Sequence, residues 1–130
     1  MAHLIVCLGS YKETWKDVDA VIKLGFFDKI YLIANEFAAL NYAKPIVKQG
    51  INIDLIRLNF TKPSEEVVPE LYVILKKRFT EDKIQDLDIA LNIASGNGKE
   101  HAIVISTLMK LGYGIRLVDL DKDGGLLEMM

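Results

Sequence analysis

The sequence predicts an α/β fold: a Rossmann-like, doubly wound and mainly parallel five-stranded sheet with helices on both faces. Two observations predict it. Five apolar segments of strand length alternate with segments of helical periodicity, and the connections are long enough for right-handed crossovers. Two of the strand segments, residues 4–8 and 89–91, are apolar at every position, as strands buried on both faces are.

The chain opens with a strand–helix–strand unit. Residues 4–8 form the first strand. A helix then carries Trp15 and further apolar residues at helical spacing, and it stops near Gly25. Residues 29–34 form the second strand.

The next pair of elements is less regular. Residues 37–47 have helical periodicity, although Pro45 is expected to kink or divide that helix. Gly50 leads into residues 51–58, where polar and apolar side chains alternate. This alternation predicts a strand at an edge of the sheet.

A long helix and a second central strand follow. Either Thr61 or Ser64 can cap the helix, which runs to about Phe79 with Pro69 in or near its first turns. Residues 87–93 then form the fourth strand.

The last elements are a helix over residues 99–111, ended by Gly112, and a strand over residues 115–120. Arg116 lies among apolar residues, so this strand is expected at the other edge. Residues 123–125 form a turn before a short tail.

These strands fit the simplest doubly wound order, 3-2-1-4-5. The chain reverses direction between strands 1 and 4, and ligands of open α/β sheets bind in that crevice. The loops that meet there are Gly9-Ser10-Tyr11 and residues 95–99. The order therefore predicts that Ser10 lies beside Lys99.

Composition limits the possible functions. We expect residues 1–130 to form a single domain. A net charge of −2 argues against a nucleic-acid-binding surface, so no DNA partner is expected. The single cysteine, Cys7, fits a reducing cytoplasm. No signal peptide and no membrane-spanning segment are recognised.

Residues 91–99 are the most informative stretch. An apolar strand runs into Gly96 and Gly98, then into Lys99 at the start of a helix. Glycines let several backbone N–H groups face one point, and the helix dipole and the lysine add positive charge. A tight turn with a surface lysine is the alternative, but a turn needs only one glycine. The stretch therefore favours a phosphate site.

Three familiar motifs do not fit. Glu100 stands where a P-loop has the Ser or Thr that binds magnesium, and Ile93 stands where its first glycine belongs. No GxGxxG follows the first strand. Residues 119–124 copy the first half of a calcium loop, but Met130 occupies the position of the bidentate glutamate.

The remaining candidates lie near the same crevice. His101 falls in the first turn of the helix, close enough to touch a ligand, but no metal site is expected because it lacks partners at ligand spacing. Tyr11 and Trp15 can stack on a base, although packing of its helix against the sheet is the favoured interpretation for Trp15.

Leu8-Gly9-Ser10 after strand 1, together with residues 91–99 after strand 4, resembles the CRISPR-associated Rossmann fold (CARF) domains. Their second motif reads asparagine, any residue, Thr or Ser, two glycines, Thr or Asn, then Lys or Arg. The matching residues here are Asn92, Ser95, Gly96 and Lys99. Asn97 replaces the second glycine, and Gly98 stands for the usual Thr.

The resemblance implies a homodimer that binds cyclic oligoadenylate across its two-fold axis. Stand-alone members include ring nucleases, which cleave this messenger and switch off the antiviral response of type III CRISPR systems. By the same resemblance Ser10 and Lys99 are the catalytic positions, with no metal and no cofactor. The expected ligand-binding residues are Gly9, Ser10, Tyr11, Asn92, Ser95, Gly96, Asn97, Gly98, Lys99 and His101.

Two other classes of function stay open at this stage. The protein can be a sensor or sink that binds the ring, most often the four- or six-membered one, without cleaving it. It can also be an unrelated α/β enzyme that uses residues 95–99 to hold a mononucleotide or a sugar phosphate.

Overall fold

The computed structural model describes residues 3–129, and its helices and strands alternate along the chain. The strands are β1 (His3–Leu8), β2 (Lys29–Ala34), β3 (Asn52–Arg57), β4 (Asp88–Asn92), β5 (Gly114–Leu120) and β6 (Leu126–Glu128). The helices are α1 (Trp15–Lys23), α2 (Glu36–Asn41), α3 (Ser64–Glu81) and α4 (Gly98–Lys110), and a short 3-10 helix, η1 (Lys12–Thr14), precedes α1.

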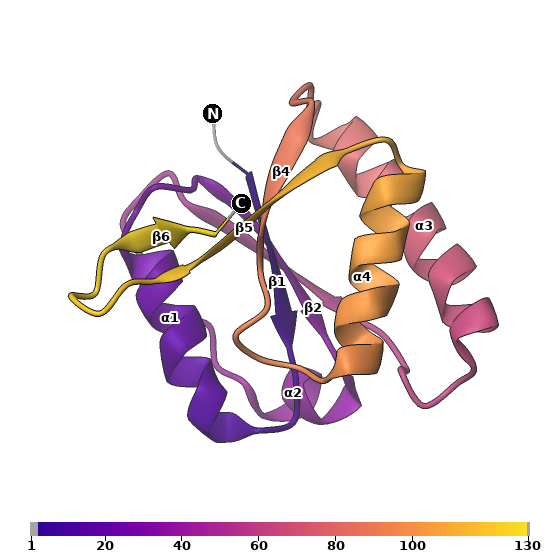
Figure 1. Cartoon of the computed structure of the whole chain (residues 1–130), viewed down its shortest axis with the longest axis horizontal. Coiled ribbons are helices and arrows are strands. Elements are labelled where there is room, and N and C mark those ends of the chain that lie inside the picture. The colour runs from indigo at the N-terminus through magenta and orange to yellow at the C-terminus, as the bar shows by residue number, and fades with distance from the viewer. Residues whose placement is uncertain (1–2, 130) are drawn as a thin grey trace.

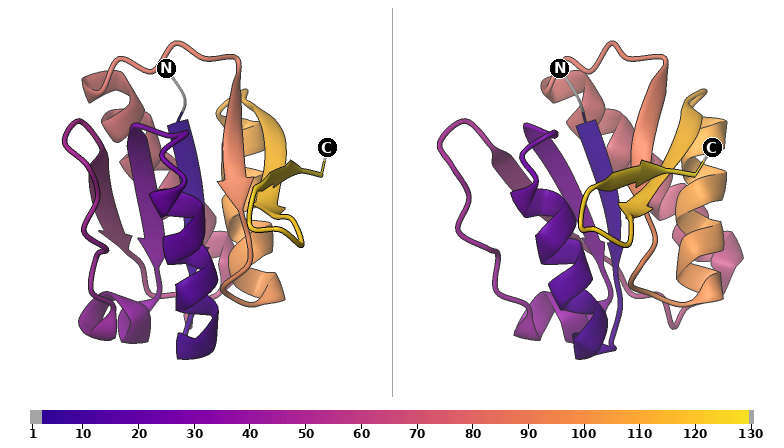
Figure 2. Two further views of the ribbon diagram at one scale, coloured as in Figure 1. Left: turned by 90° about the vertical axis from the view of Figure 1, so that its left-hand side faces the viewer. Right: turned by 60° about the vertical axis from the view of Figure 1, so that its left-hand side comes forward.

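The strands form one sheet in the order β3-β2-β1-β4-β5-β6 (Figures 1 and 2). β1 pairs in parallel with β2 on one side and with β4 on the other. The predicted order 3-2-1-4-5 is therefore confirmed for the first five strands, and β3 is an edge strand as predicted.

The sixth strand corrects the other edge. The tail after the turn forms β6, which pairs with β5 in antiparallel fashion, so β5 is not an edge strand. Arg116 on β5 approaches Asp88 at 3.5 Å and Glu128 at 3.6 Å. A basic residue fits this strand because carboxylates lie on the strands on both sides of it.

Helices cover both faces of the sheet, with α1 on one face and α3 and α4 on the other (Figure 1). β1 divides its side chains between two cores. Leu4 and Val6 pack in the core that contains residues of α1 and α2, whereas Ile5 packs in the core that contains residues of α3 and α4. All six residues of β1 are buried; the apolar sequence predicts this for residues 4–8, and His3 is buried beside Asp86.

Two helix boundaries differ from the sequence-based prediction. The helix expected over residues 37–47 ends at Asn41, and Tyr42 already has an extended backbone. Pro45 has no N–H and disfavours helical geometry in the residue before it, so the segment leaves the helix early. Neither Thr61 nor Ser64 caps α3, since Pro63 occupies the cap position. Thr61 instead donates its N–H to Asn59 in a local turn.

Candidate functional site

Two loops meet at the carboxyl edge of the sheet, at the lower edge in Figure 1. One follows β1 and the other follows β4, and these strands are neighbours. The Gly9 N–H donates to the Ser95 hydroxyl oxygen at 2.9 Å, which ties the loops together. The crevice predicted from the strand order is therefore where the two candidate loops come together.

The loops approach so closely that glycine is needed in both. A Cβ on Gly9 would lie 2.5 Å from the Gly96 Cα, which no side chain tolerates. Gly96 has a φ of +97°, a left-handed conformation that other residues rarely adopt. Gly98 is different, because a Cβ there would meet nothing within 4 Å.

The N-terminus of α4 has a capping box. The Asn97 side chain accepts the Glu100 N–H at 2.8 Å, and the Glu100 carboxylate accepts the Asn97 N–H at 2.9 Å. The N–H groups of Asn97 and Glu100, which lie in the stretch predicted to bind a phosphate, therefore already have hydrogen-bond acceptors within the protein. Among residues 3–129, the N–H groups of Gly98 and Lys99 have no partner, and they remain for an anion.

A hollow of about 380 Å³ lies between the loops. Its lining residues are Ser10, Tyr11, Thr14, Asn35, Gly96, Asn97 and Glu100. Four of them were predicted as ligand-binding residues: Ser10, Tyr11, Gly96 and Asn97. The structure thus brings Ser10 and the Gly96-Asn97 turn to one opening.

Asn35 and Glu100 were not predicted. Asn35 follows β2 and caps α2, and its side-chain amide donates to both the Ser10 hydroxyl oxygen and the Glu100 carboxylate, each at 2.9 Å. Glu100 is only 5% exposed. Burial, and then the charge of Glu100, raise the pKa of the Cys7 thiol to about 12.

A sequence signal for Asn35 existed. β2 runs parallel to β1, with Ala34 opposite Leu8, so the residue after β2 must lie at the same edge as Ser10. In the sequence, Glu100 is the residue that breaks the P-loop match. Its role in the capping box was readable from its position three residues after Asn97.

Three other predicted site residues are buried and do not line the hollow. Asn92 and Ser95 are fully buried, and Gly9 is buried as well. The Asn92 amide donates to the Val118 carbonyl at 2.9 Å, which binds β4 to β5. These side chains do not line the hollow.

Lys99 and His101 also point elsewhere. The exposed Lys99 ammonium donates to the Lys62 carbonyl oxygen at 2.6 Å, and Lys99 is not among the residues that line the hollow. The His101 Nε2 lies 2.7 Å from the Ser95 carbonyl oxygen, so it must carry a proton and donate it. Ser10 and Lys99 therefore stand at different places around the α4 N-terminus.

Trp15 is hydrogen-bonded to the loop that follows β1. Its indole N–H donates to the Gly9 carbonyl at 2.8 Å, and its ring makes an edge contact with Tyr42 at 5.6 Å between centroids. This favours the packing interpretation for Trp15. Tyr11 is 68% exposed at the mouth of the hollow, where its ring can meet a ligand.

The charge around the hollow is uneven. Its lining contains one carboxylate, that of Glu100, and no lysine or arginine. Any positive potential for a phosphate therefore comes from outside this lining, from the N-terminus of α4 and its Lys99. Within residues 3–129, no group of three or more His, Cys, Asp or Glu side chains is arranged to hold a metal ion.

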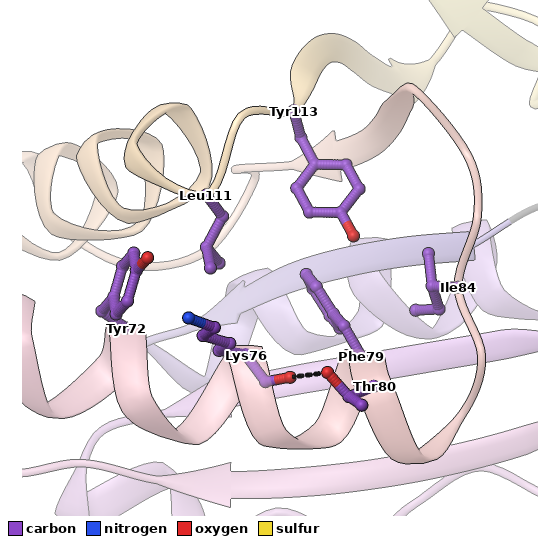
Figure 3. Close-up of a pocket in the computed structure, with 7 residues that line it drawn as sticks. All are labelled: Tyr72, Lys76, Phe79, Thr80, Ile84, Leu111 and Tyr113. Atoms are coloured by element: carbon purple, nitrogen blue, oxygen red, sulfur yellow. Dashed lines mark hydrogen bonds between the residues drawn. The ribbon is translucent and has the colours of Figure 1, made fainter.

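A second hollow of about 310 Å³ lies at the opposite end of α4 (Figure 3). Its lining residues come from α3, from Ile84 and from the turn before β5. The rings of Phe79 and Tyr113 make an edge contact there, with 5.4 Å between their centroids. None of the predicted ligand-binding residues lines it. In the described part of the chain, no helix combines the length and apolar character needed to cross a membrane.

Comparison with known proteins supports the fold. No protein-family model matches the sequence. No curated protein matches it either. Among solved structures, it is similar to Enterococcus italicus Csm6 bound to cyclic hexa-2'-fluoro-hexa-dAMP, with a TM-score of 0.61 and 12% identity. The match covers 94% of this chain and 34% of that one, so this chain spans about a third of the length of Csm6.

At this identity the likeness shows the fold alone. The chain has a Rossmann-like α/β fold similar to that of the matched part of Csm6, and the fold implied by the sequence resemblance is confirmed.

Proposed function

We propose that the protein binds a cyclic oligoadenylate at the carboxyl edge of its sheet, with cyclic tetra-adenylate as the preferred ring. The observation that carries this proposal is the convergence of the β1–α1 and β4–α4 loops on one hollow beside the open N-terminus of α4. A Csm6 of the same fold was solved with a cyclic hexanucleotide, which supports the ligand class. Binding of such a ring would place the protein in type III CRISPR signalling.

The proposed binding unit is a two-fold homodimer. One hollow of about 380 Å³ accommodates only a part of a cyclic tetranucleotide, so two copies around a two-fold axis fit a ring with its own symmetry. Ala102 and Met109 leave apolar surface exposed on α4, and Val73 does so on the neighbouring α3. This surface is the proposed contact between the subunits.

We further propose that the dimer cleaves the ring without a metal, which would switch the signal off. Each RNA linkage has a nucleophile of its own, the ribose 2′-OH. The 2′-oxygen forms a bond to phosphorus, the P–O5′ bond breaks, the 2′-OH loses its proton and the O5′ gains one. The products are linear fragments that end in 2′,3′-cyclic phosphate.

The residues proposed for this step are Ser10 and Lys99. In-line alignment of a nucleophile can lower a barrier by up to about 7–11 kcal/mol, and a strong donor to the phosphoryl oxygens contributes about 3–4 kcal/mol. Ser10 would orient the reacting linkage, and Lys99 with the Gly98 and Lys99 N–H groups would stabilise the phosphoryl charge. Lys99 must leave the Lys62 carbonyl for this role.

The deciding experiment incubates the purified protein with labelled cyclic tetra- and hexa-adenylate in EDTA and resolves the products. We expect slow cleavage that Ser10→Ala and Lys99→Ala each reduce strongly. Lys110→Ala is the matched control, since Lys110 is an exposed lysine at the far end of the same helix. A ring with 2′-O-methyl groups should bind and resist cleavage. Cleavage of that blocked ring would show that water is the nucleophile and would overturn the mechanism.

Binding without cleavage is the second candidate function. The observation that favours it is the position of Lys99, whose ammonium contacts the Lys62 carbonyl rather than the hollow that contains Ser10. A sensor or sink would retain intact ring under single-turnover conditions, and Lys99→Ala would weaken binding only. Equal affinities for AMP and the ring in calorimetry would contradict both candidates.

A further inference from the structure

The side-chain amide of Asn35 has a fixed orientation. Its oxygen accepts the Ala38 N–H at 2.9 Å, and its nitrogen faces a Glu100 carboxylate oxygen at 2.9 Å. A backbone N–H can only donate and a carboxylate can only accept. Exchanging the amide oxygen and nitrogen would break both hydrogen bonds, so the chemistry of the neighbours sets the orientation.

This orientation determines the polarity of the Ser10 hydroxyl. The Asn35 nitrogen has two hydrogens, one directed to Glu100 and the other to the Ser10 oxygen at 2.9 Å. Ser10 is therefore an acceptor toward Asn35. Its own proton has no acceptor among residues 3–129, and Ser10 is exposed at the hollow.

These hydrogen bonds form a relay that runs from Glu100 through Asn35 to Ser10, and both carboxylate oxygens of Glu100 accept a hydrogen bond. Glu100 is 5% exposed, and its second carboxylate oxygen accepts the Asn97 N–H at 2.9 Å. The relay joins the start of α4, the junction of β2 with α2, and the loop after β1. A carboxylate-anchored amide holds its partner more firmly than an amide in water does, because the successive hydrogen bonds polarise one another.

We infer that Asn35, anchored by Glu100, is a positioning residue that presents the Ser10 hydroxyl to the ligand as a hydrogen-bond donor. The ligand atom that meets Ser10 is then an acceptor, such as a phosphoryl oxygen, and not the proton of the 2′-OH. This inference rests on the proposed function and selects between the two ways in which Ser10 can orient a linkage.

The test uses Asn35→Ser, in which a serine keeps a cap for α2 but removes the bridging amide. We expect Asn35→Ser to lower the rate of cyclic tetra-adenylate cleavage roughly tenfold, the effect of one hydrogen bond. The double variant with Ser10→Ala should lose no more than Ser10→Ala alone, because Asn35 acts through Ser10. Asn41→Ser is the control, since Asn41 is exposed at the other end of α2.

Two results would overturn the inference: wild-type cleavage by Asn35→Ser, or losses that multiply in the double variant, as a merely structural role would give. A ligand-free measurement separates this failure from that of the proposed function. In the unliganded protein, Ser10→Ala should shift the NMR resonances of the Asn35 side-chain NH₂ group and leave those of Asn41 in place. If the wild type does not bind the ring, the proposed function fails. If the Asn35 resonances do not shift, the relay is refuted, whether or not the ring binds.

Discussion

At the scale of single residues, the loop between β4 and α4 uses glycine for two different reasons. Gly96 has a left-handed backbone, and a Cβ there would lie 3.1 Å from both the Glu100 carboxylate and the His101 ring. Gly98 is the first residue of α4 and has open space around it. Gly96 is needed for the shape of the turn, whereas Gly98 has no side chain that would cover the N-terminus of α4.

Gly96→Ala is therefore expected to lower the free energy of unfolding by about 1–3 kcal/mol, the cost of a left-handed conformation for alanine. Gly98→Ala is the matched control and should leave that free energy unchanged or raise it by a few tenths of a kcal/mol, since alanine favours helix. Urea unfolding of both variants measures the difference. Equal losses at the two positions would contradict the assigned roles.

The buried thiol of Cys7 is expected to make the free energy of unfolding depend on pH in the alkaline range. Burial raises the pKa of its thiol from 9.0 to about 12, so the folded state keeps the proton at pH values where the unfolded state releases it. This contribution to stability is complete below pH 9 and is lost as the pH rises toward 12. Burial also raises the pKa of Tyr31 and Tyr42, each of which donates to an aspartate, and these groups act in the same direction.

We expect the unfolding free energy of the wild type to fall above pH 9 more steeply than that of Cys7→Ala, by about 1 kcal/mol per pH unit. Denaturant titrations at several pH values from neutral to strongly alkaline measure both slopes. The two tyrosines remain in the variant and serve as an internal control. Parallel slopes would show that the thiol does not titrate differently in the folded state.

At the scale of elements, α3 contains a proline beyond its first turn. Pro69 is the sixth residue of this helix, so its missing N–H leaves the Glu65 carbonyl without its helical partner. Pro69 is exposed, and therefore alanine can replace it without disturbing the core.

Pro69→Ala is expected to raise the free energy of unfolding by about 1–2 kcal/mol. The regained hydrogen bond outweighs the greater freedom of the unfolded chain. Thermal and urea unfolding measure the change. Lys77→Ala, at another exposed position of α3, should change stability by less than about 0.5 kcal/mol. A destabilised Pro69→Ala variant would mean that the proline helps to begin the helix.

The elements also show what a sequence can reveal. The central strands were predictable because apolar runs such as residues 4–8 are long and unbroken. β6 was missed because three residues are too short to show alternation, although Asp123-Gly124 between apolar segments is a hairpin signal. The helix after β2 was predicted too long because apolar spacing continues past the point where Pro45 prevents helix.

The site was predictable where it depends on local sequence and was not where it depends on packing. The turn at Gly96 and the start of α4 follow from glycines and a cap. The contribution of Asn35 depends on the parallel pairing of β2 with β1. The direction of the Lys99 side chain depends on the loop before α3, and sequence spacing contains no information about it.

At the scale of the whole molecule, the proposed dimer is directly testable. Sedimentation equilibrium at micromolar concentration should give twice the 14.6 kDa mass of one chain. Ala102→Arg, which adds a long charged side chain to the exposed surface of α4, should shift the protein toward monomer. Asn41→Arg, on the opposite face of the sheet, is the matched control. A monomeric wild type would refute the dimer.

The hydrogen bond between Gly9 and Ser95 joins residues 86 positions apart. During synthesis, the loop that bears Ser10 leaves the ribosome long before Ser95 and Glu100 do. The hollow therefore cannot assemble on a nascent chain until Glu100 has emerged. No shorter fragment from the N-terminus can form the hollow proposed to bind the ligand, and this edge of the sheet is complete only once β4 has inserted beside β1.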